Sequence, residues 1–206
     1  MLTLHLVRHG DTEASGEGVF CGDLDALLTP SGLAQAERVG ALAVKLRPEA
    51  LYVSPKRRAL QTVEPAARLL KLEPAIDDRL REIAYGTWEG MREVDVMSAQ
   101  ATAYEAWVRD PALHPPPGGE GGFSIAARSI AAVERIQSEH PAGVVLVVSH
   151  KATIRVLTCA LLGLHIGRFR DKVACPTASL TTFEFGDRGA MLVRLGDTTH
   201  LSPAHA

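Results

Sequence analysis

A polar group of residues directly follows the first apolar run of the chain. Leu2 to Val7 is apolar enough for a buried strand, and Arg8, His9, Gly10 and Thr12 come immediately after it, where an α/β sheet binds ligands. An arginine is a permanent cation suited to phosphate, a histidine can be a neutral nucleophile near pH 7, and glycine lets the backbone approach an anion closely. The stretch predicts a phosphate site with its own nucleophile, with solvated polar residues at a strand end as the alternative.

Composition and charge exclude several classes of protein. Of the 206 residues, 46% are hydrophobic and 22% charged, as in an ordinary globular protein. The net charge of −2 leaves no global basic surface that would recruit nucleic acid or an anionic membrane. The 3 cysteines form neither a disulfide framework nor a metal motif, and no signal peptide or membrane-spanning stretch is found. We therefore expect a cytoplasmic protein with a single domain over residues 1–206.

Strand and helix signals alternate in the first part of the chain. After a glycine-rich loop from Glu13 to Cys21, Thr29-Pro30 is typical of a helix start, and apolar residues then recur at helical spacing. Leu51 to Val53 is a short strand, and a further helix follows it, in which we expect Pro65 to produce a kink or a break. Strand followed by helix, twice in succession, is the βαβ pattern of a parallel sheet.

The second part of the chain predicts an insertion and the remaining strands. Residues 91–122 combine a helical stretch, Glu93 to Val108, with a proline- and glycine-rich loop, and we expect them to form an insertion or lid. The apolar run Val144 to Val148 is typical of a central parallel strand. The other predicted elements are a strand at 74–76, an irregular loop at 79–90, helices at 125–136 and 153–162, and a hairpin of strands at 180–185 and 191–195.

Reactive side chains follow several of these elements. Arg8 and His9 follow the first strand, His150 follows the strand predicted to be central, and Arg58 and Glu82 come soon after two others. Because the carboxyl ends of parallel strands lie along one edge of a sheet, we expect these side chains to lie close together.

Six segments, which together cover nearly the whole chain, resemble the histidine phosphatase superfamily, also called phosphoglycerate mutase-like. One such match is a weak signal, but all six stand in the order in which the family has them. The segments are Leu6 to Thr12, Phe20 to Ala36, Ser54 to Thr62, Leu80 to Gly90, Pro117 to Glu120 and Val148 to His150. The resemblance implies an α/β fold, a three-layer αβα sandwich with a mostly parallel central sheet and a small helical insertion or lid.

The resemblance also implies a role for each reactive residue. His9 would be the nucleophile that forms a phosphohistidine, with Arg8, Arg58 and His150 around the phosphoryl oxygens and Glu82 as the proton donor. The physical reading agrees, because phosphoryl transfer is mainly a problem of positioning and charge neutralisation. A carboxyl group beside a bound dianion holds its proton more strongly, so Glu82 can supply a proton to the leaving group and later take one from water.

Further substrate contacts are expected at positions that match the family or depart from it. Ser15 stands where the family commonly has Asn, and Lys151 where it usually has Gly; Lys151 either adds a cation at the pocket rim or points to solvent. Tyr85 is either a packing residue or a substrate contact, since its position lines the pocket in some relatives. The expected substrate-binding residues are Arg8, Thr12, Ser15, Cys21, Gly22, Arg58, Tyr85, His150 and Lys151.

These observations predict a phosphomonoesterase that hydrolyses a small phosphorylated metabolite without cofactor or metal. One alternative is a cofactor-dependent phosphoglycerate mutase; the short insertion, and Gly121 in place of the usual Ser, disfavour it. Another is a non-catalytic phospho-ligand binding protein, which the retained reactive groups disfavour. Asp23 and Asp25 mimic the metal motif of haloacid-dehalogenase-like phosphatases, but no apolar strand precedes them. We expect a small-molecule phosphate ester as the partner, no nucleic acid and no membrane, and a homodimer is left open.

Overall fold

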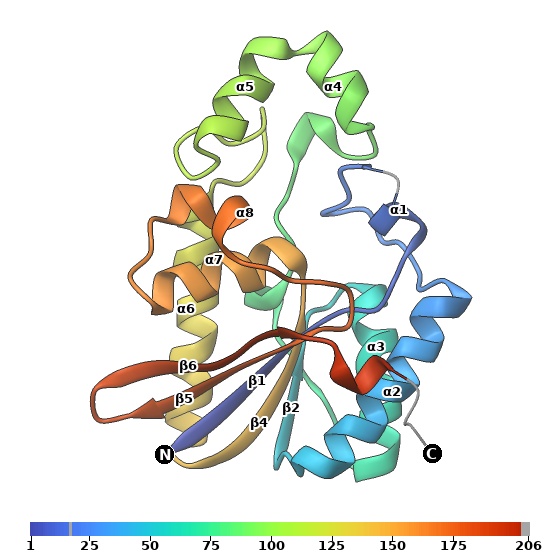
Figure 1. Cartoon of the computed structure of the whole chain (residues 1–206), viewed down its shortest axis with the longest axis vertical. Helices are drawn as coiled ribbons and strands as arrows, with labels where there is room; N and C mark the ends of the chain where they lie inside the picture. Colours follow the sequence, from blue (N-terminus) through green and yellow to red (C-terminus); the bar gives the residue numbers. More distant parts are fainter. Residues whose placement is uncertain (17, 203–206) are drawn as a thin grey trace.

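The computed structural model describes residues 1–16 and 18–202 and is built around a six-stranded sheet, in the order β3-β2-β4-β1-β5-β6 (Figure 1). The first four strands in this order are parallel to one another, and the last two form an antiparallel hairpin beside them. The mostly parallel sheet expected from the sequence is therefore confirmed. The strands are β1 (Leu2–Arg8), β2 (Ala50–Val53), β3 (Ala75–Ile76), β4 (Gly143–Ser149), β5 (Leu180–Gly186) and β6 (Gly189–Asp197).

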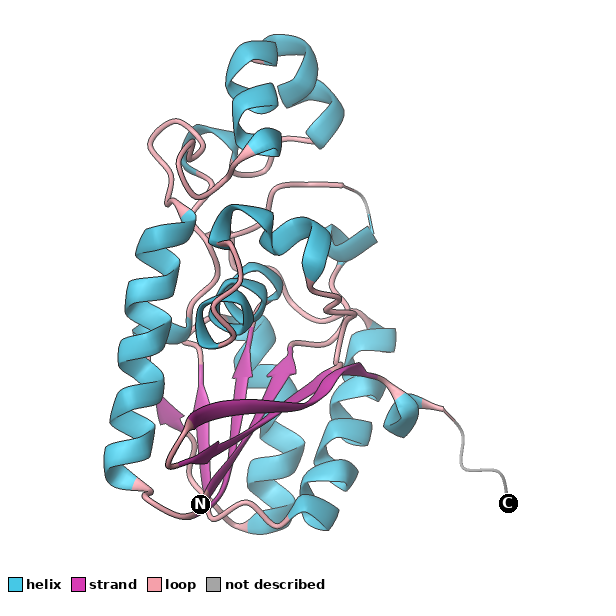
Figure 2. Ribbon diagram, turned by 60° about the vertical axis from the view of Figure 1, so that its left-hand side comes forward, coloured by secondary structure: helices cyan, strands magenta, loops and turns pink. Residues whose placement is uncertain are grey.

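Helices cover both faces of the sheet and give three layers (Figure 2). Because side chains alternate along a strand, β1 directs Leu2, Leu4 and Leu6 to one face and Val7 to the other. The leucines pack with α6 (Gly122–Glu139) and α7 (Lys151–Leu161), whereas Val7 packs with α2 (Pro30–Leu46) and α3 (Arg57–Leu70). Each buried leucine contributes roughly 1.5–3 kcal/mol. The predicted αβα sandwich is confirmed.

Helix α2 begins as its sequence predicts, and α3 does not break where a break was expected. The Thr29 hydroxyl accepts a hydrogen bond from the Gly32 amide, which caps the start of α2. Helix α3 continues through Pro65, which is buried. A Cβ on Gly40 of α2 would lie 2.8 Å from the Pro65 Cβ, so the two helices meet closely at this point. Tertiary packing against α2 thus supports the helix across a residue that lacks an amide hydrogen.

The insertion predicted at residues 91–122 lies beyond the carboxyl ends of the parallel strands (Figure 1). The single helix expected at 93–108 is two helices, α4 (Glu93–Ala99) and α5 (Ala101–Arg109). They part at Gln100, whose backbone is not helical and whose side-chain oxygen accepts a hydrogen bond from the Trp88 indole at 2.9 Å. On either side of the break, Trp88 and Trp107 pack in one aromatic cluster. Helical spacing in the sequence does not reveal such tertiary packing, so it predicted one continuous helix.

Short elements complete the chain around the carboxyl edge of the sheet. They are α1 (Glu13–Gly16), α8 (Phe169–Lys172) and the 3₁₀ turns η1 (Asp78–Leu80), η2 (Gly86–Trp88), η3 (Ile166–Arg168) and η4 (Thr199–Leu201). Across the described residues, none of the helices combines the length and apolar character needed to span a membrane. Glu17, in the predicted loop, and residues 203–206, at the end of the predicted 1–206 domain, lie outside the described residues.

Candidate active site

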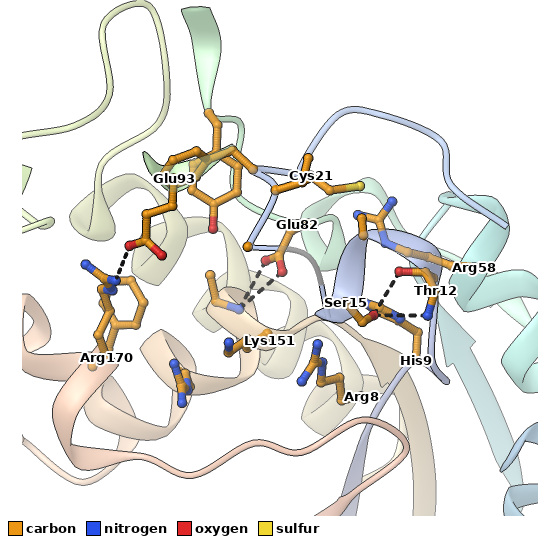
Figure 3. Close-up of a pocket in the computed structure, with 18 of the residues that line it drawn as sticks. Arg8, His9, Thr12, Ser15, Cys21, Arg58, Glu82, Glu93, Lys151 and Arg170 are labelled. Atoms are coloured by element: carbon orange, nitrogen blue, oxygen red, sulfur yellow. Dashed lines mark hydrogen bonds and ion pairs between the residues drawn. The ribbon is translucent and has the colours of Figure 1, made fainter. Parts of the chain in front are cut away.

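A cavity of about 180 Å³ opens at the carboxyl edge of the parallel strands (Figure 3). Each element that reaches this edge delivers a polar side chain: β1 is followed by His9, β4 by His150, and α3 presents Arg58 from its first turn. The residues that line the cavity are Arg8, His9, Thr12, Ala14, Ser15, Gly18, Val19, Phe20, Cys21, Arg58, Glu82, Tyr85, Glu93, Trp107, Lys151, Ala152, Arg155, Phe169 and Arg170.

His9 is held as a neutral imidazole with one ring nitrogen directed by the backbone. Its Nδ1 lies 2.7 Å from the Gly10 carbonyl oxygen, so Nδ1 carries the proton and Nε2 keeps its lone pair. The side chain is only 5% exposed. Burial, followed by the positive charges of Arg8 and Arg58, lowers the pKa of His9 well below its ordinary value of 6.5. A buried, unprotonated imidazole between two arginines is suited to attack a phosphorus atom.

Gly10 has a different role from the one its place in the motif suggests. The sequence interpretation was that this glycine lets the backbone approach an anion, but its amide donates to the Thr62 hydroxyl at 3.0 Å. A Cβ at this position would lie 2.7 Å from the Gly32 carbonyl oxygen in the first turn of α2. Gly10 is therefore needed because the end of β1 and the start of α2 touch, and this contact fixes the position of His9.

Arg58 and His150 form a buried pair behind His9. Arg58 is 1% exposed and donates to the carbonyl oxygens of Leu24 (2.7 Å) and Gly22 (2.9 Å), and its Nε donates to His150 Nδ1 (3.3 Å). His150 Nε2 therefore carries the proton, which it donates to the Ser54 hydroxyl at 2.6 Å. Burial, together with His9 and Arg58, lowers the pKa of His150 well below 6.5. In this state His150 is neutral and both its ring nitrogens contact the protein.

The predicted proton donor, Glu82, sits against the first turn of α7. Its carboxylate accepts hydrogen bonds from the amides of Ala152 (3.2 Å) and Thr153 (3.3 Å), and from that of its neighbour Ile83 (3.0 Å). The N-terminus of a helix supplies unpaired amides and a positive partial charge to such a group. The irregular segment that carries Glu82 is thereby anchored on a regular element, and Figure 3 shows the carboxylate directed into the pocket.

Arg128, which the sequence did not single out, fixes the segment that carries Glu82. Its guanidinium donates to the backbone carbonyl oxygens of Arg79 (2.8 Å) and Arg81 (2.7 Å) and forms an ion pair with Glu120 at 2.7 Å. The side chains of Arg128 and Glu120 are only 9% and 10% exposed. Arg128 thus connects Glu120 of the insertion with the segment that carries Glu82. No local sequence signal predicts this connection.

Most of the expected substrate-binding residues line the cavity. Thr12, Ser15, Cys21, Tyr85 and Lys151 do so, and Ser15 Oγ accepts from the Thr12 amide at 3.0 Å. Of the two readings of Lys151, its place in the lining matches the one that adds a cation to the pocket.

Gly22 and His150 are not among the lining residues; both lie behind the Arg58 guanidinium. A Cβ on Gly22 would lie 1.8 Å from the Ile83 carbonyl oxygen, so the glycine is needed for chain packing. The Gly22 carbonyl and the His150 ring both accept hydrogen bonds from Arg58 and hold it in place.

Four further lining residues had no motif to reveal them. Glu93 begins α4, Trp107 belongs to α5, Arg155 to α7 and Arg170 to α8. Arg170 Nη2 lies 3.5 Å from Glu93 Oε1, and the Arg170 guanidinium carbon lies 3.9 Å from the centre of the Trp107 ring. The cation of Arg155 is one helical turn after Lys151 on α7, a spacing of four residues that could have signalled a shared face.

The Asp23 and Asp25 pair serves the loop that it occupies. Asp23 forms an ion pair with Lys56 at 3.1 Å, and Asp25 accepts a hydrogen bond from the Arg57 amide at the start of α3 at 2.8 Å. Neither aspartate lines the cavity. Within the described part of the chain, no group of three or more His, Cys, Asp or Glu side chains has an arrangement that could hold a metal ion.

A neutral histidine between two arginines at the carboxyl edge of a parallel sheet defines a phosphoryl-transfer protein of the α/β class. The sequence matches the histidine phosphatase superfamily (branch 1) over residues 4–198. The chain belongs to that superfamily, so the resemblance and the fold class inferred from the sequence are confirmed.

Relatives and solved structures agree with this membership. The chain is 31% identical to phosphoserine phosphatase 1 of Hydrogenobacter thermophilus over 201 aligned residues. This alignment covers 98% of this chain and 95% of that protein. It is 35% identical over 170 residues to glucosyl-3-phosphoglycerate phosphatase of Mycolicibacterium vanbaalenii, covering 79% and 75% respectively. The solved structure named Bacillus stearothermophilus YhfR has a TM-score of 0.92 and 28% identity, covering 98% of this chain and 100% of that one.

Proposed function

We propose that this chain is a phosphomonoesterase that hydrolyses a small phosphorylated metabolite through a phosphohistidine on His9. The observation that carries the proposal is the placement of His9, which is buried beside Arg8 and Arg58 with Nδ1 bonded to the Gly10 carbonyl oxygen, so that Nε2 keeps its lone pair. Relatives named as phosphatases of phosphoserine and of glucosyl-3-phosphoglycerate, which align with most of the chain, support this reading.

In the first half-reaction His9 Nε2 attacks the phosphorus atom and the bond to the leaving oxygen breaks. Arg8 and Arg58 neutralise the charge on the phosphoryl oxygens, which is the main requirement for transfer. Glu82, held at the start of α7, gives its proton to the leaving oxygen. In the second half-reaction Glu82 takes a proton from water, the water oxygen bonds to phosphorus, and the bond to His9 breaks. Phosphate leaves and the neutral imidazole is restored.

The direct test is to trap the intermediate. The protein is mixed with a ³²P-labelled phosphate monoester and quenched rapidly without acid, because phosphohistidine is acid-labile. Peptide mapping should then find the labelled phosphate on His9. His9→Ala should lose turnover by at least about 10⁴-fold, as removal of a covalent nucleophile does in other enzymes. Its far-ultraviolet circular dichroism should match the wild type, because the side chain lies after β1 and outside the hydrophobic clusters. Stable phosphate on another residue would overturn the proposal.

Two controls separate the phosphatase from its alternatives. Turnover should persist in EDTA, because Arg8 and Arg58 supply the neutralising charge; loss of turnover that Mg²⁺ restores would favour the reading based on Asp23 and Asp25. Incubation with 3-phosphoglycerate should release inorganic phosphate, whereas conversion to 2-phosphoglycerate without net release would identify a mutase.

A further inference from the structure

The amide that follows His9 in the chain is bound by a side chain of helix α3. The Gly10 nitrogen donates to Thr62 Oγ1 at 3.0 Å, and the same hydroxyl donates to the Arg58 carbonyl oxygen at 2.7 Å. A hydroxyl has one proton to donate and lone pairs with which to accept. Because the proton of Thr62 is given to Arg58, a lone pair is left for Gly10. The hydroxyl therefore joins the end of β1 to the first turn of α3.

This hydroxyl links the backbones of two residues that line the cavity. Gly10 accepts a hydrogen bond from His9 Nδ1 at 2.7 Å, and Arg58 lies one helical turn before Thr62. His9 and Arg58 line the cavity, whereas Thr62 lies outside the lining. A continuous series of three hydrogen bonds thus runs from the ring of His9, through Gly10 and Thr62, to the backbone of Arg58.

Burial makes the bond between Gly10 and Thr62 hard to replace. Thr62 is 0% exposed, and within residues 1–16 and 18–202 the structure gives the Gly10 amide no other hydrogen-bond partner. A buried amide without a partner is costly, so loss of the hydroxyl would favour a different orientation of Gly10. Glycine has the backbone freedom to adopt one. The carbonyl that directs the ring of His9 would turn with it.

Thr62 differs from an ordinary threonine in a helix. Such a hydroxyl commonly donates to the carbonyl four residues earlier, and that bond alone has no bearing on the site. Thr62 makes this bond and also accepts from a residue 52 positions away in the sequence. Thr158 in α7 provides a contrast, because it is 1% exposed and its hydroxyl has no hydrogen-bond partner within the described residues.

We propose that Thr62 is a positioning residue, which aligns His9 with a phosphoryl group held at Arg58 and does not itself touch the substrate. The inference rests on the proposed phosphatase function, because this alignment matters for transfer to His9. Reacting atoms have to approach to about 3–3.5 Å, and a misplacement of about 1 Å can lower the rate about 10²-fold. Thr62 should therefore affect the rate of transfer much more than the binding of the ester.

The test removes the hydroxyl while nearly keeping the shape of the side chain. Thr62→Val should lower kcat by about 10- to 100-fold with KM nearly unchanged, because the arginines of the cavity are retained. The loss should be equal for an alkyl phosphate and for p-nitrophenyl phosphate, since His9 attacks both. Thr62→Ser keeps the hydroxyl and should retain most of kcat. Thr158→Val makes the matched change and should keep the wild-type kcat.

The ring of His9 supplies a readout that needs no turnover. Its ¹⁵N NMR signals are those missing from the spectrum of His9→Ala. In the wild type they should show the proton on Nδ1 alone, and in Thr62→Val a mixture of the two neutral forms. Thr62→Ala removes the same hydroxyl with less bulk and replaces the valine variant if that does not fold.

The outcomes separate this role from the phosphatase proposal. An unchanged kcat or unchanged ring signals in Thr62→Val would overturn the role of Thr62. An equal loss of kcat in Thr62→Ser or in Thr158→Val would also overturn it, because the effect would then not come from the hydroxyl that binds Gly10. Turnover retained in His9→Ala would instead overturn the phosphatase proposal, and the ring signals would still report on Thr62.

Discussion

The two ends of the pocket are held in different ways. The phosphoryl end (Arg8, His9, Arg58 and Glu82, with His150 bonded to Arg58 outside the lining) consists of buried side chains fixed by backbone groups of the sheet edge and of α7. At the lid end (Phe20, Glu93, Trp107 and Arg170, with Tyr104 packed on Trp107 outside the lining) aromatic rings pack on one another, and the Arg170–Glu93 pair is 29% and 42% exposed. We therefore expect the reacting group to meet a rigid surface, and the remainder of the substrate to meet one whose contacts are easier to change.

After the loss of the nucleophile in His9→Ala, the largest effect is expected from Glu82→Gln at the phosphoryl end. Without a proton donor, hydrolysis of an alkyl phosphate should slow by about 10²- to 10⁴-fold, because an alkoxide is a poor leaving group. Hydrolysis of p-nitrophenyl phosphate should slow far less, since its leaving group departs as an anion. Steady-state kinetics on both esters measure the ratio of the two losses. Equal losses would assign Glu82 to phosphate positioning and leave the acid to be found elsewhere.

The next effect concerns Arg58, which lines the cavity at the proposed phosphoryl position and donates hydrogen bonds to Gly22 and His150. Arg58→Met should lower kcat by about 10²- to 10³-fold, as loss of one charge-stabilising donor does. It should also abolish inhibition by vanadate, which we expect to occupy the phosphoryl position. Arg57→Met, one residue earlier and exposed, provides the matched control. Unchanged vanadate inhibition in Arg58→Met would place this side chain outside the phosphoryl site.

Burial along β1 should also make the protein less stable in acid. Burial, and next the charge of Arg194, lowers the pKa of His5 to about 4, below the ordinary 6.5. The unfolded chain therefore binds the proton more tightly, and stability present above pH 6.5 is lost as the pH falls toward 4. This residue alone should lower the free energy of unfolding by about 2 kcal/mol between pH 7 and pH 5.

Urea unfolding of His5→Gln at the two pH values isolates that contribution. Glutamine can still bond to the Thr182 hydroxyl, which lies 2.9 Å from His5 Nδ1, but it does not titrate. The variant should lose about 2 kcal/mol less than the wild type over this range. An equal loss would show that other groups, such as His9 and His150, account for the acid sensitivity.

The smallest effect is expected at the lid end. Arg170→Met removes a partly exposed ion pair and a cation–π contact, together worth about 1–2 kcal/mol. We expect KM to rise by about tenfold or less, with kcat nearly unchanged, because the phosphoryl end is untouched. Arg168→Met, in an exposed pair with Asp171, is the control. A large fall in kcat instead would show that the lid end positions the reacting groups and would remove the contrast between the two ends.

The sequence predicts the phosphoryl end well because strand ends carry local signals. An apolar run followed by a polar group marks both β1 with His9 and β4 with His150, and the parallel topology brings them to one edge. The roles predicted for these residues remain predictions that the variants above test. Gly10 shows the limit of such reasoning, because its nearest constraint is the Gly32 carbonyl of a different element.

The lid end could not be predicted to the same extent, because its residues meet only through tertiary structure. Arg170 follows a stretch without clear helical or strand period, and its partners Glu93 and Trp107 lie more than sixty residues earlier in the chain. Gln100 breaks a stretch of helical spacing to accept a hydrogen bond from Trp88. Neither contact follows from propensity or spacing, which describe neighbours along the chain.

Helix α7 serves the pocket in two ways. Its first amides hold the Glu82 carboxylate, and its residues Lys151, Ala152 and Arg155 line the cavity. Lys151 and Arg155 are four residues apart, about 6 Å along the helix axis. A substitution of Arg155 would therefore change the charge of the cavity one turn away from the amides that hold Glu82, so that this part of the pocket can evolve without moving that carboxylate.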